Sequence, residues 1–231
     1  MDGITLSKIA HELRTPLTLI NSTLQLIEAQ LPQMKELKYW IQLNEDFRDM
    51  NDLVDNLTTL PDTKEAMEER QEVNLYHMLQ TLQDGFLRNP IGREASLSLS
   101  STAEAREIAS HFPCDRVQIK QVFTNLMKNA LEATLHQEER TVQVSLSTRQ
   151  VPLSNGKATL HFLRVSVHDN GSGIPKEILP QIYTPFVSGK KNGTGIGLSI
   201  VENLVHQHNG YLEVESGSSG TTFSVFLPYD P

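Results

Sequence analysis

Apolar side chains near the start of the chain recur every three or four residues, which is the spacing of one helix face. This stripe predicts a helix over about residues 4–30, and a similar stripe predicts a second helix over about residues 34–60. Leu31-Pro32 marks a turn between them. Two helices cannot bury both stripes alone, so we expect a hairpin that pairs with a second copy as a four-helix bundle. The first stripe consists of Leu6, Ile9, Leu13, Leu17, Ile20, Leu24, Ile27 and Leu31.

The hydrophobic pattern changes after a polar, charged segment at residues 61–71, which we interpret as a linker after a first domain at residues 1–60. From residue 72 to residue 231, helical repeats alternate with strand-like runs. The order predicts an α/β sandwich, with one mixed sheet and helices on one face, so the whole chain is of the α+β class. We expect helices over residues 75–87, 114–135 and 197–208, and strands over residues 96–100, 141–150, 159–168, 211–216 and 221–227.

The first predicted helix presents a histidine to solvent, because His11 lies about 180° from the apolar stripe. Glu12 is close enough to take a proton from one imidazole nitrogen and leave the other nucleophilic. Thr15 follows on the same polar face, and Pro16 bends the helix by removing one hydrogen bond. An exposed histidine on an amphipathic helix usually has no function, so this pattern needs support from elsewhere in the chain.

Two asparagines supply the first support. Asn125 and Asn129 are spaced i,i+4 and project from one face of a predicted helix, although asparagine is a mediocre helix former. Amide oxygens suit Mg²⁺, which leaves coordination places for phosphate oxygens and water. Taken alone, the pair is equally explained by contacts with backbone or solvent.

A carboxylate and two glycines follow the strand predicted at residues 159–168. Asp169 can accept a hydrogen bond from an exocyclic amine such as that of adenine, and Gly171 and Gly173 allow a flat ring to approach closely. Thr222, on the last predicted strand, can add a hydroxyl to this base site. Strand-end turns of this composition are common, so the motif is moderately specific.

A second glycine-rich turn leads into the helix predicted at residues 197–208. The unpaired backbone N–H groups and the positive dipole end of a helix N-terminus attract phosphates. The turn is not a P-loop, because no Gly-Lys-Ser/Thr follows. It consists of Gly193, Thr194, Gly195, Ile196, Gly197 and Leu198.

Together these segments resemble the boxes of the two-component sensor histidine kinases. The H-box, N-box, first glycine box, F-box and second glycine box correspond to residues 11–17, 125–130, 169–173, 184–186 and 193–197. Five boxes in order are very specific. The resemblance implies a dimerisation and phosphoacceptor hairpin followed by a Bergerat-type ATP-binding domain, and its finer likeness is to nitrogen-regulation and sporulation-type kinases.

The resemblance also implies roles for the first helix. His11 would be the phosphoacceptor, Glu12 its general base, and Thr15 a group that helps to hydrolyse the phosphorylated partner. The implied partners are a response regulator receiver domain, which takes the phosphoryl group on an aspartate, and a second copy of the chain. The resemblance also allows this chain a phosphatase activity towards the phosphorylated regulator.

For the second domain the resemblance implies ATP and Mg²⁺ as cofactors. Asn129 would hold Mg²⁺, Asn125 would assist at the phosphates, Asp169 would read adenine, and Lys190 matches a lid lysine that meets the terminal phosphates. ATPases of the same fold carry a water-activating glutamate where this chain has Asn125, and a carboxamide cannot act as that base. Two alternatives stay open: a degenerate scaffold, phosphotransfer or phosphatase-dominant relative, and a hydrolytic ATPase.

Composition narrows these functions further. The 231 residues carry a net charge of −8 and a pI near 5.5, which argues against direct nucleic-acid binding. The sole cysteine, Cys114, predicts a reducing, cytoplasmic location, and no apolar run approaches 18 residues, so we expect no membrane contact in this chain. The ten residues before His11 leave no room for a sensor, so the chain is an excised core or receives its signal through another protein or membrane partner.

Overall fold

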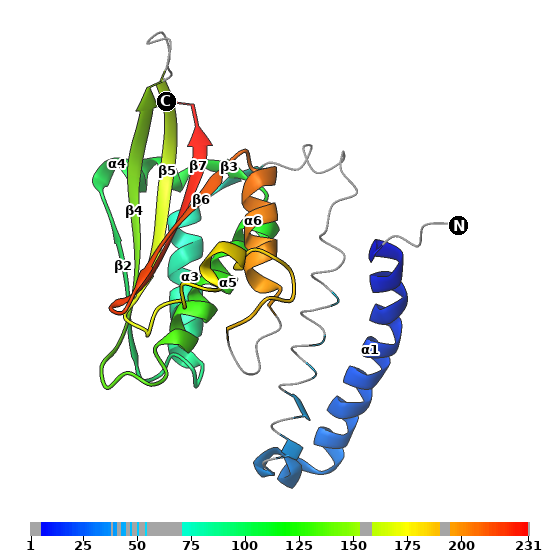
Figure 1. The fold of residues 1–231 in the computed structure, drawn as a ribbon. Coiled ribbons are helices and arrows are strands. Elements are labelled where there is room, and N and C mark those ends of the chain that lie inside the picture. Colours follow the sequence, from blue (N-terminus) through cyan, green and yellow to red (C-terminus); the bar gives the residue numbers. More distant parts are fainter. Residues whose placement is uncertain are drawn as a thin grey trace. The chain divides into compact units, whose positions relative to one another are not determined.

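The computed structural model describes residues 6–37, 39–40, 43–44, 47, 50, 54, 71–152, 159–189 and 195–230, with side chains of the first helix described from Leu13 onward (Figure 1). The chain divides into two compact units, Met1–Lys64 and Glu65–Pro231. Within these ranges no helix combines the length and the apolar character that crossing a membrane requires.

The first unit begins with α1 (Leu6–Gln30), which contains Pro16. The second predicted helix starts later than expected, because Pro32–Glu36 forms the 3₁₀ helix η1 and Leu37 is extended. Proline suits the start of such a turn, since it lacks the N–H that would have no partner there. Residues described as helical beyond η1 include Trp40, Leu43, Phe47, Met50 and Val54.

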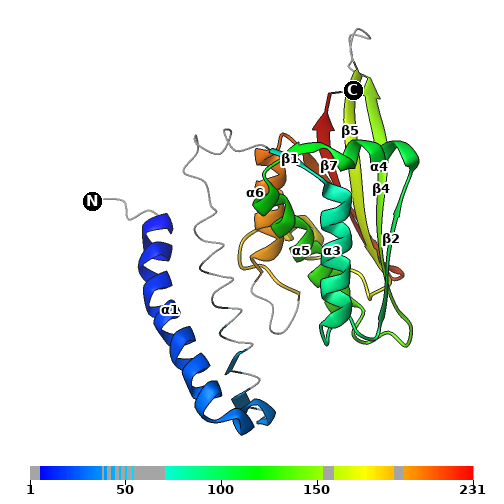
Figure 2. The ribbon, with the colours of Figure 1, turned by 180° about the vertical axis from the view of Figure 1, so that it is seen from behind.

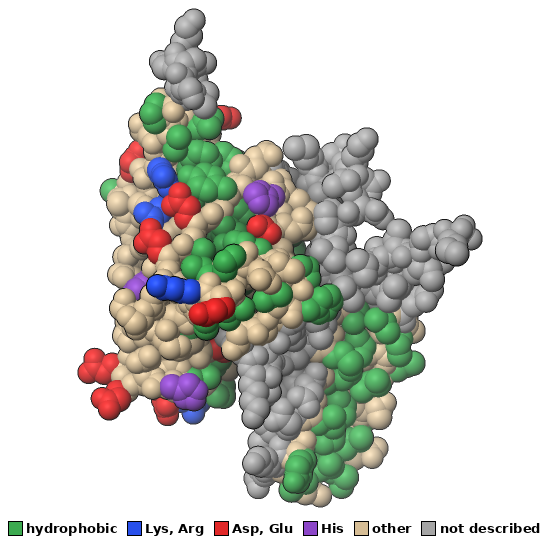
Figure 3. All heavy atoms as spheres, in the orientation of Figure 1, with side chains coloured by type: hydrophobic (Ala, Val, Ile, Leu, Met, Phe, Trp, Pro, Cys, Tyr) green, Lys and Arg blue, Asp and Glu red, His purple; other side chains and the backbone are tan. Residues whose placement is uncertain are grey.

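Only part of the apolar stripe of α1 is buried within the unit. Leu17 and Leu24 form its core with Trp40, Phe47 and Val54. The Trp40 indole N–H donates to Glu28 Oε1 at 3.0 Å, which ties the two halves of the hairpin together. Figure 3 shows further apolar side chains along the visible side of α1. The first unit therefore presents apolar surface that its own residues leave uncovered.

The second unit is built on a five-stranded sheet with the order β2-β4-β5-β7-β6. Strands β2 and β4 are parallel, and the other neighbours are antiparallel, so the sheet is mixed as predicted. The strands are β2 (Ala95–Ser101), β4 (Arg140–Pro152), β5 (Thr159–Asp169), β6 (Tyr211–Gly217) and β7 (Gly220–Tyr229). Residues 153–158, between β4 and β5, lie outside the described residues.

Helices cover one face of this sheet, which confirms the predicted α/β sandwich (Figures 1 and 2). They are α3 (Leu75–Arg88), α4 (Ala103–Ser110), α5 (Arg116–Ala133) and α6 (Gly197–Gln207), with the short 3₁₀ helix η2 (Leu179–Gln181) before α6. The core is made by alternate residues of the central strands, such as Val165 and Val225, packed against α5 residues such as Phe123 and Met127.

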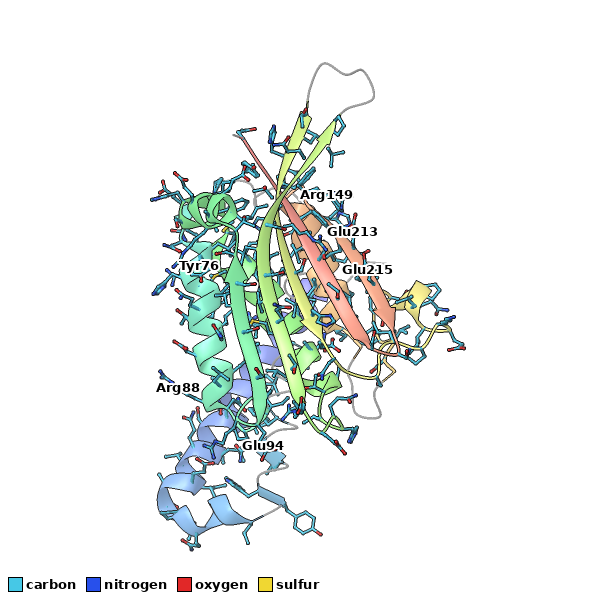
Figure 4. All side chains as sticks on the ribbon, turned by 90° about the vertical axis from the view of Figure 1, so that its left-hand side faces the viewer. Tyr76, Arg88, Glu94, Arg149, Glu213 and Glu215 are labelled. Carbon is cyan, nitrogen blue, oxygen red and sulfur yellow. The ribbon has the colours of Figure 1, made fainter. Side chains whose placement is uncertain are left out.

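The other face of the sheet carries both charged and aromatic side chains, and Phe162, Tyr211 and Phe226 pack against one another there. Arg149 of β4 and Glu213 of β6 form an ion pair of 2.7 Å on this outer face, and Glu215 lies beside them (Figure 4). A separate two-stranded sheet pairs β1 (Gln71–Val73) with β3 (Phe112–Cys114) ahead of α5. This small sheet and α4 are absent from the sequence-based prediction.

Candidate functional site

Asn125 and Asn129 lie next to the first residue of α6. Asp115 begins α5 by accepting hydrogen bonds from two backbone N–H groups, and buried apolar residues hold the helix against the sheet. A Cβ atom at Gly197 would lie 3.5 Å from Asn125 Oδ1 and 4.0 Å from Asn129 Nδ2. The absence of a side chain at Gly197 therefore lets the backbone at the start of α6 approach the asparagine pair.

The N-terminus of α6 has the character of an anion site. Its N-cap residue, Ile196, makes no side-chain capping hydrogen bond, so the cap leaves the first-turn N–H groups available. Gly197 and Leu198 are half-buried there. Together, the amide groups of α5 and the dipole of α6 could hold phosphates and a cation bound to them.

Asp169 ends β5 with its carboxylate buried, at 3% exposure. Its Oδ1 accepts the Gly171 backbone N–H at 2.8 Å, which holds the turn after the strand. A Cβ at Gly171 would come within 2.6 Å of the Ala133 carbonyl oxygen, so only glycine lets this turn pack against the last turn of α5. The turn thereby joins the carboxylate to the helix that carries the asparagine pair.

Gly173 closes the same turn against the β6–β7 hairpin. Its φ is +76°, and a Cβ there would lie 2.0 Å from the Gly217 carbonyl oxygen. The backbone N–H of Ile174 donates to Ser216 Oγ at 2.8 Å, and Ser216 Oγ lies 2.9 Å from Thr221 Oγ1. These contacts bring the end of β6 and the start of β7 beside Asp169.

The structure corrects the expectation for Thr222. Thr222 is paired with His168 and Glu215 on the outer face of the sheet, and its hydroxyl lies 2.9 Å from His168 Nδ1. Asp169 is paired with Thr221, so these two side chains share the helix-covered face. Because side chains alternate along a strand, choosing the neighbouring threonine reverses the face.

Several predicted site residues lie outside the described part of the structure. Lys190, Gly193 and Thr194 fall in residues 190–194, which the structure does not describe. The chain before this segment contacts the chain after it, because the Phe186 N–H donates to the Gly195 carbonyl oxygen at 3.0 Å. Both Phe186 and Gly195 have a φ of 68°, a conformation that costs energy for phenylalanine.

In the first unit, the backbone of His11 and Glu12 belongs to α1, but their side chains are outside the described set. Thr15 is exposed on the same helix. Thr18 Oγ1 donates to the Arg14 carbonyl oxygen, and Ser22 Oγ donates to the Thr18 carbonyl oxygen. The polar face that follows Thr15 is therefore made of hydroxyl groups bonded back onto their own helix.

Two polar residues that hold the site were missed by the sequence reasoning. Asn170 accepts the Thr141 N–H at 2.9 Å and donates to the Glu139 carbonyl oxygen at 2.7 Å. Arg140 is buried, at 9% exposure, and donates to carbonyl oxygens of Ile91 and Leu131. Asn170 is adjacent to Asp169, a position that marks it for attention, whereas Arg140 carries no local pattern that distinguishes it from a surface arginine.

Among the described residues no group of three or more His, Cys, Asp or Glu is placed to hold a metal ion. A divalent ion at the asparagine pair would therefore share its coordination with phosphate oxygens and water. Burial raises the pKa of Tyr183 to about 12, and the negative charge of Glu202 in α6 adds to this shift.

Comparison with known proteins agrees with this geometry. Residues 114–231 match the family described as histidine kinase-, DNA gyrase B- and HSP90-like ATPase, and residues 3–63 match the His Kinase A (phospho-acceptor) domain. Sensory histidine kinase/phosphatase NtrB of Vibrio alginolyticus is 33% identical over 222 residues, which cover 95% of this chain and 60% of that protein. The NtrB of Escherichia coli O157:H7 is 32% identical, with the same coverage.

Solved structures show the same fold. The catalytic domain of histidine kinase ThkA matches 69% of this chain and 95% of its own, with a TM-score of 0.56 and 28% identity. Full-length ShkA in complex with AMPPNP covers 98% of this chain and 46% of its own with a TM-score of 0.70; its 21% identity supports the fold alone. The chain spans about 60% of the length of the curated relatives named above. With its two matched domains, the chain belongs to the histidine kinase-, DNA gyrase B- and HSP90-like ATPases, among the histidine kinases that carry a His Kinase A phospho-acceptor domain.

Proposed function

We propose that this chain is the core of a sensor histidine kinase that phosphorylates itself on His11 with ATP and passes the phosphoryl group to an aspartate of a response regulator. The observation that carries the proposal is the approach of Gly197 to Asn125 and Asn129, which joins a helix N-terminus to two amide side chains. This arrangement suits a nucleoside triphosphate. The first unit supplies α1, the helix that carries the proposed nucleophile His11.

Each part of the nucleotide has a proposed partner. Asp169 accepts a hydrogen bond from the adenine amine, with Gly171 and Gly173 allowing the base to approach. Thr221, which shares the face of Asp169, takes the place proposed earlier for Thr222. The phosphates lie at the start of α6, held by backbone N–H groups of Gly195, Gly197 and Leu198. For Lys190, Gly193 and Thr194 we retain the predicted contacts with the terminal phosphates.

Asn129 would bind Mg²⁺ through its side-chain oxygen, and the ion would neutralise charge on the phosphates. Asn125 lies one helical turn before Asn129. Its side chain cannot remove a proton from water, because a carboxamide is not a base. This chemistry favours transfer to a protein nucleophile over hydrolysis of ATP. It also distinguishes the proposal from a hydrolytic ATPase.

In the proposed reaction, Glu12 accepts the proton of one imidazole nitrogen of His11. The other nitrogen attacks the γ-phosphorus, so an N–P bond forms while the bond to the β,γ-bridging oxygen breaks and ADP leaves. A receiver aspartate then attacks the phosphohistidine and forms an acyl phosphate. Thr15 orients the water that later hydrolyses this acyl phosphate, which gives the protein a phosphatase activity as well.

We also propose the organisation of the chain and of its assembly. Residues 1–60 form the phosphoacceptor hairpin, 61–71 the linker and 72–231 the ATP-binding domain, and two copies pair through the hairpin. The sole cysteine, Cys114, agrees with a reducing compartment such as the cytoplasm.

The test is incubation with γ-labelled ATP and Mg²⁺, followed by acid treatment, because phosphohistidine is labile to acid. The parent protein should carry acid-labile label, and His11→Gln should carry none while it still binds ATP. His136→Gln, which changes an exposed histidine of the ATP-binding unit, is the matched control and should keep the label. Label on His11→Gln would refute the assignment, and label that never joins the parent protein would support a hydrolytic ATPase or a scaffold.

The metal is tested in the same assay. In Asn129→Ala, ATP affinity should no longer depend on Mg²⁺ and phosphorylation should be lost, whereas binding without Mg²⁺ should match the parent. If the alanine variant keeps Mg²⁺-dependent ATP binding, the ion is held elsewhere.

A further inference from the structure

Three polar groups form a hydrogen-bonded chain that ends beside Asp169. The Ile174 backbone N–H lies 2.8 Å from Ser216 Oγ, and Ser216 Oγ lies 2.9 Å from Thr221 Oγ1. Thr221 is buried and is paired with Asp169 across β5 and β7. The chain therefore runs from the first glycine turn, through the end of β6, to the face on which we propose that adenine binds.

The direction of the hydroxyl protons in this chain follows from the donor at its start. A backbone N–H can only donate, so Ser216 Oγ must act as an acceptor towards Ile174. A hydroxyl that accepts a hydrogen bond becomes a stronger donor, which favours donation from Ser216 to Thr221 Oγ1. The Thr221 proton is then left to point away from Ser216. In the opposite direction, Thr221 would spend its proton on Ser216 and could only accept from a ligand.

We infer that Ser216 is a positioning residue for base recognition: it fixes Thr221 as a hydrogen-bond donor beside the acceptor Asp169. This inference rests on the proposed nucleotide site. Adenine presents a donor, its 6-amino group, next to an acceptor, its ring nitrogen N1, and so matches an acceptor and a donor placed side by side. Guanine and hypoxanthine present a carbonyl oxygen and a protonated N1, and so oppose both groups.

The backbone around Ser216 keeps this arrangement rigid. Gly173, with φ of +76°, lies so close to Gly217 that a Cβ would come within 2.0 Å of its carbonyl oxygen. Gly220 has a φ of +128°, and a Cβ atom there would lie only 1.8 Å from the Asp169 carbonyl oxygen. The turn after β5 and the β6–β7 hairpin are thus packed backbone to backbone on both sides of the Ser216–Thr221 pair.

The experiment measures the affinity of Ser216→Ala for three nucleotides by calorimetry: ATP, purine riboside triphosphate, which keeps the N1 acceptor but lacks the amino group, and inosine triphosphate, whose N1 is protonated. Loss of one oriented hydrogen bond should weaken ATP and purine riboside triphosphate by the same factor, about threefold to tenfold. Inosine triphosphate should bind as tightly as before, or more tightly. Ser216→Thr keeps a hydroxyl and should restore the parent affinities.

Two further variants separate positioning from a general structural role. Ser224→Ala removes a hydroxyl from the outer face of the same sheet, where Ser224 bonds to Ser166, and should leave all three affinities unchanged. In a Thr221→Val background, Ser216→Ala should cause no further loss of selectivity, because the group that it orients is gone.

If Ser216→Ala loses affinity equally for all three nucleotides, the inference is overturned, because the change would show only that the turn has loosened. The inference is also overturned if none of the three affinities changes. Neither result affects the proposed kinase activity, which the labelling of His11 tests independently. If the parent protein binds no ATP, the proposed function itself fails.

Discussion

At the scale of single residues, the site depends on Gly197, a glycine whose lack of a side chain leaves space beside the asparagine pair. A Cβ at Gly197 would make an ordinary contact of 3.5 Å with Asn125 Oδ1, and no positive φ is recorded there. Alanine is therefore compatible with the fold at this position. Its methyl group would nevertheless occupy the space between α6 and the asparagine pair, where we place the phosphates.

Gly197→Ala should consequently lower ATP affinity without lowering stability. We expect about a tenfold weaker Kd, or about 1.4 kcal/mol, measured by calorimetry with Mg-ATP. The midpoint of urea unfolding should stay the same or rise, because alanine has a higher helix propensity than glycine. Gly85→Ala is the matched control, since a Cβ at Gly85 of α3 meets no atom within 4 Å. Equal ATP affinity in both variants would contradict our placement of the phosphates.

The two threonines of β7 show what residue patterns alone could and could not predict. Asp169 and the glycines of its turn could be selected from sequence, because residue type and order carry the information. The choice between Thr221 and Thr222 depends on the register of β7 against β5, which is set by long-range pairing. Ser216 could not be predicted as part of the site, because its role arises only where β6 and the first glycine turn meet.

At the scale of elements, long periodic segments were predicted and short ones were not. The five sheet strands and α3, α5 and α6 have enough repeats to define a period. In contrast, α4 (Ala103–Ser110) buries only Ala105 and Ala109, which are too small to mark an apolar stripe. The pairing of β1 with β3 involves three residues on each strand, so it depends on tertiary contacts.

The end of α5 is held by a buried cation, and this contact can be tested. Arg140 donates to the Leu131 carbonyl oxygen at 3.1 Å in the last turn of α5 and to the Ile91 carbonyl oxygen at 2.6 Å. Lysine keeps the charge but cannot reach several acceptors with a planar fork. Arg140→Lys should therefore lower the free energy of unfolding by about 2 kcal/mol, measured in urea.

The matched control for this change is Arg88→Lys, at an exposed position in the last turn of α3. We expect it to shift the free energy of unfolding by less than about 0.5 kcal/mol. If Arg140→Lys is as mild as the control, the guanidinium is not what fixes the end of α5.

At the scale of the whole molecule, the first unit leaves exposed three of the six stripe residues of α1 and its end whose side chains the structure describes. Leu13, Ile20 and Leu31 are 42%, 45% and 44% exposed, although they belong to the same stripe as the buried Leu17 and Leu24. A second copy of the hairpin would bury them in a four-helix bundle. Ile20→Glu should therefore shift the protein from dimer towards monomer in sedimentation equilibrium, because a carboxylate would have to be desolvated at the interface.

Leu19→Glu serves as the control for dimerisation, since Leu19 is 65% exposed and lies outside the stripe. That variant should remain dimeric. A dimer that withstands Ile20→Glu would show that the copies pair through a different surface, or that the hairpin of a single chain is covered in some other way.

The assembly with a regulator is tested at the polar face of α1. Thr15 is exposed one turn after His11, so a receiver domain that brings its aspartate to His11 also brings any acyl phosphate close to this hydroxyl. Thr15→Ala should spare autophosphorylation and forward transfer, because neither step uses the hydroxyl. Dephosphorylation of the regulator should slow by about tenfold or more, since the attacking water is no longer oriented.

Thr23→Ala separates this role from a general effect on the helix. Thr23 is also exposed on α1, and its hydroxyl donates to the Leu19 carbonyl oxygen, two turns beyond Thr15. A time course with labelled regulator should show parent-like dephosphorylation in Thr23→Ala and a slow phase only in Thr15→Ala. If both variants dephosphorylate the regulator as fast as the parent, water is oriented by the regulator itself, and α1 contributes the phosphoacceptor without the phosphatase group.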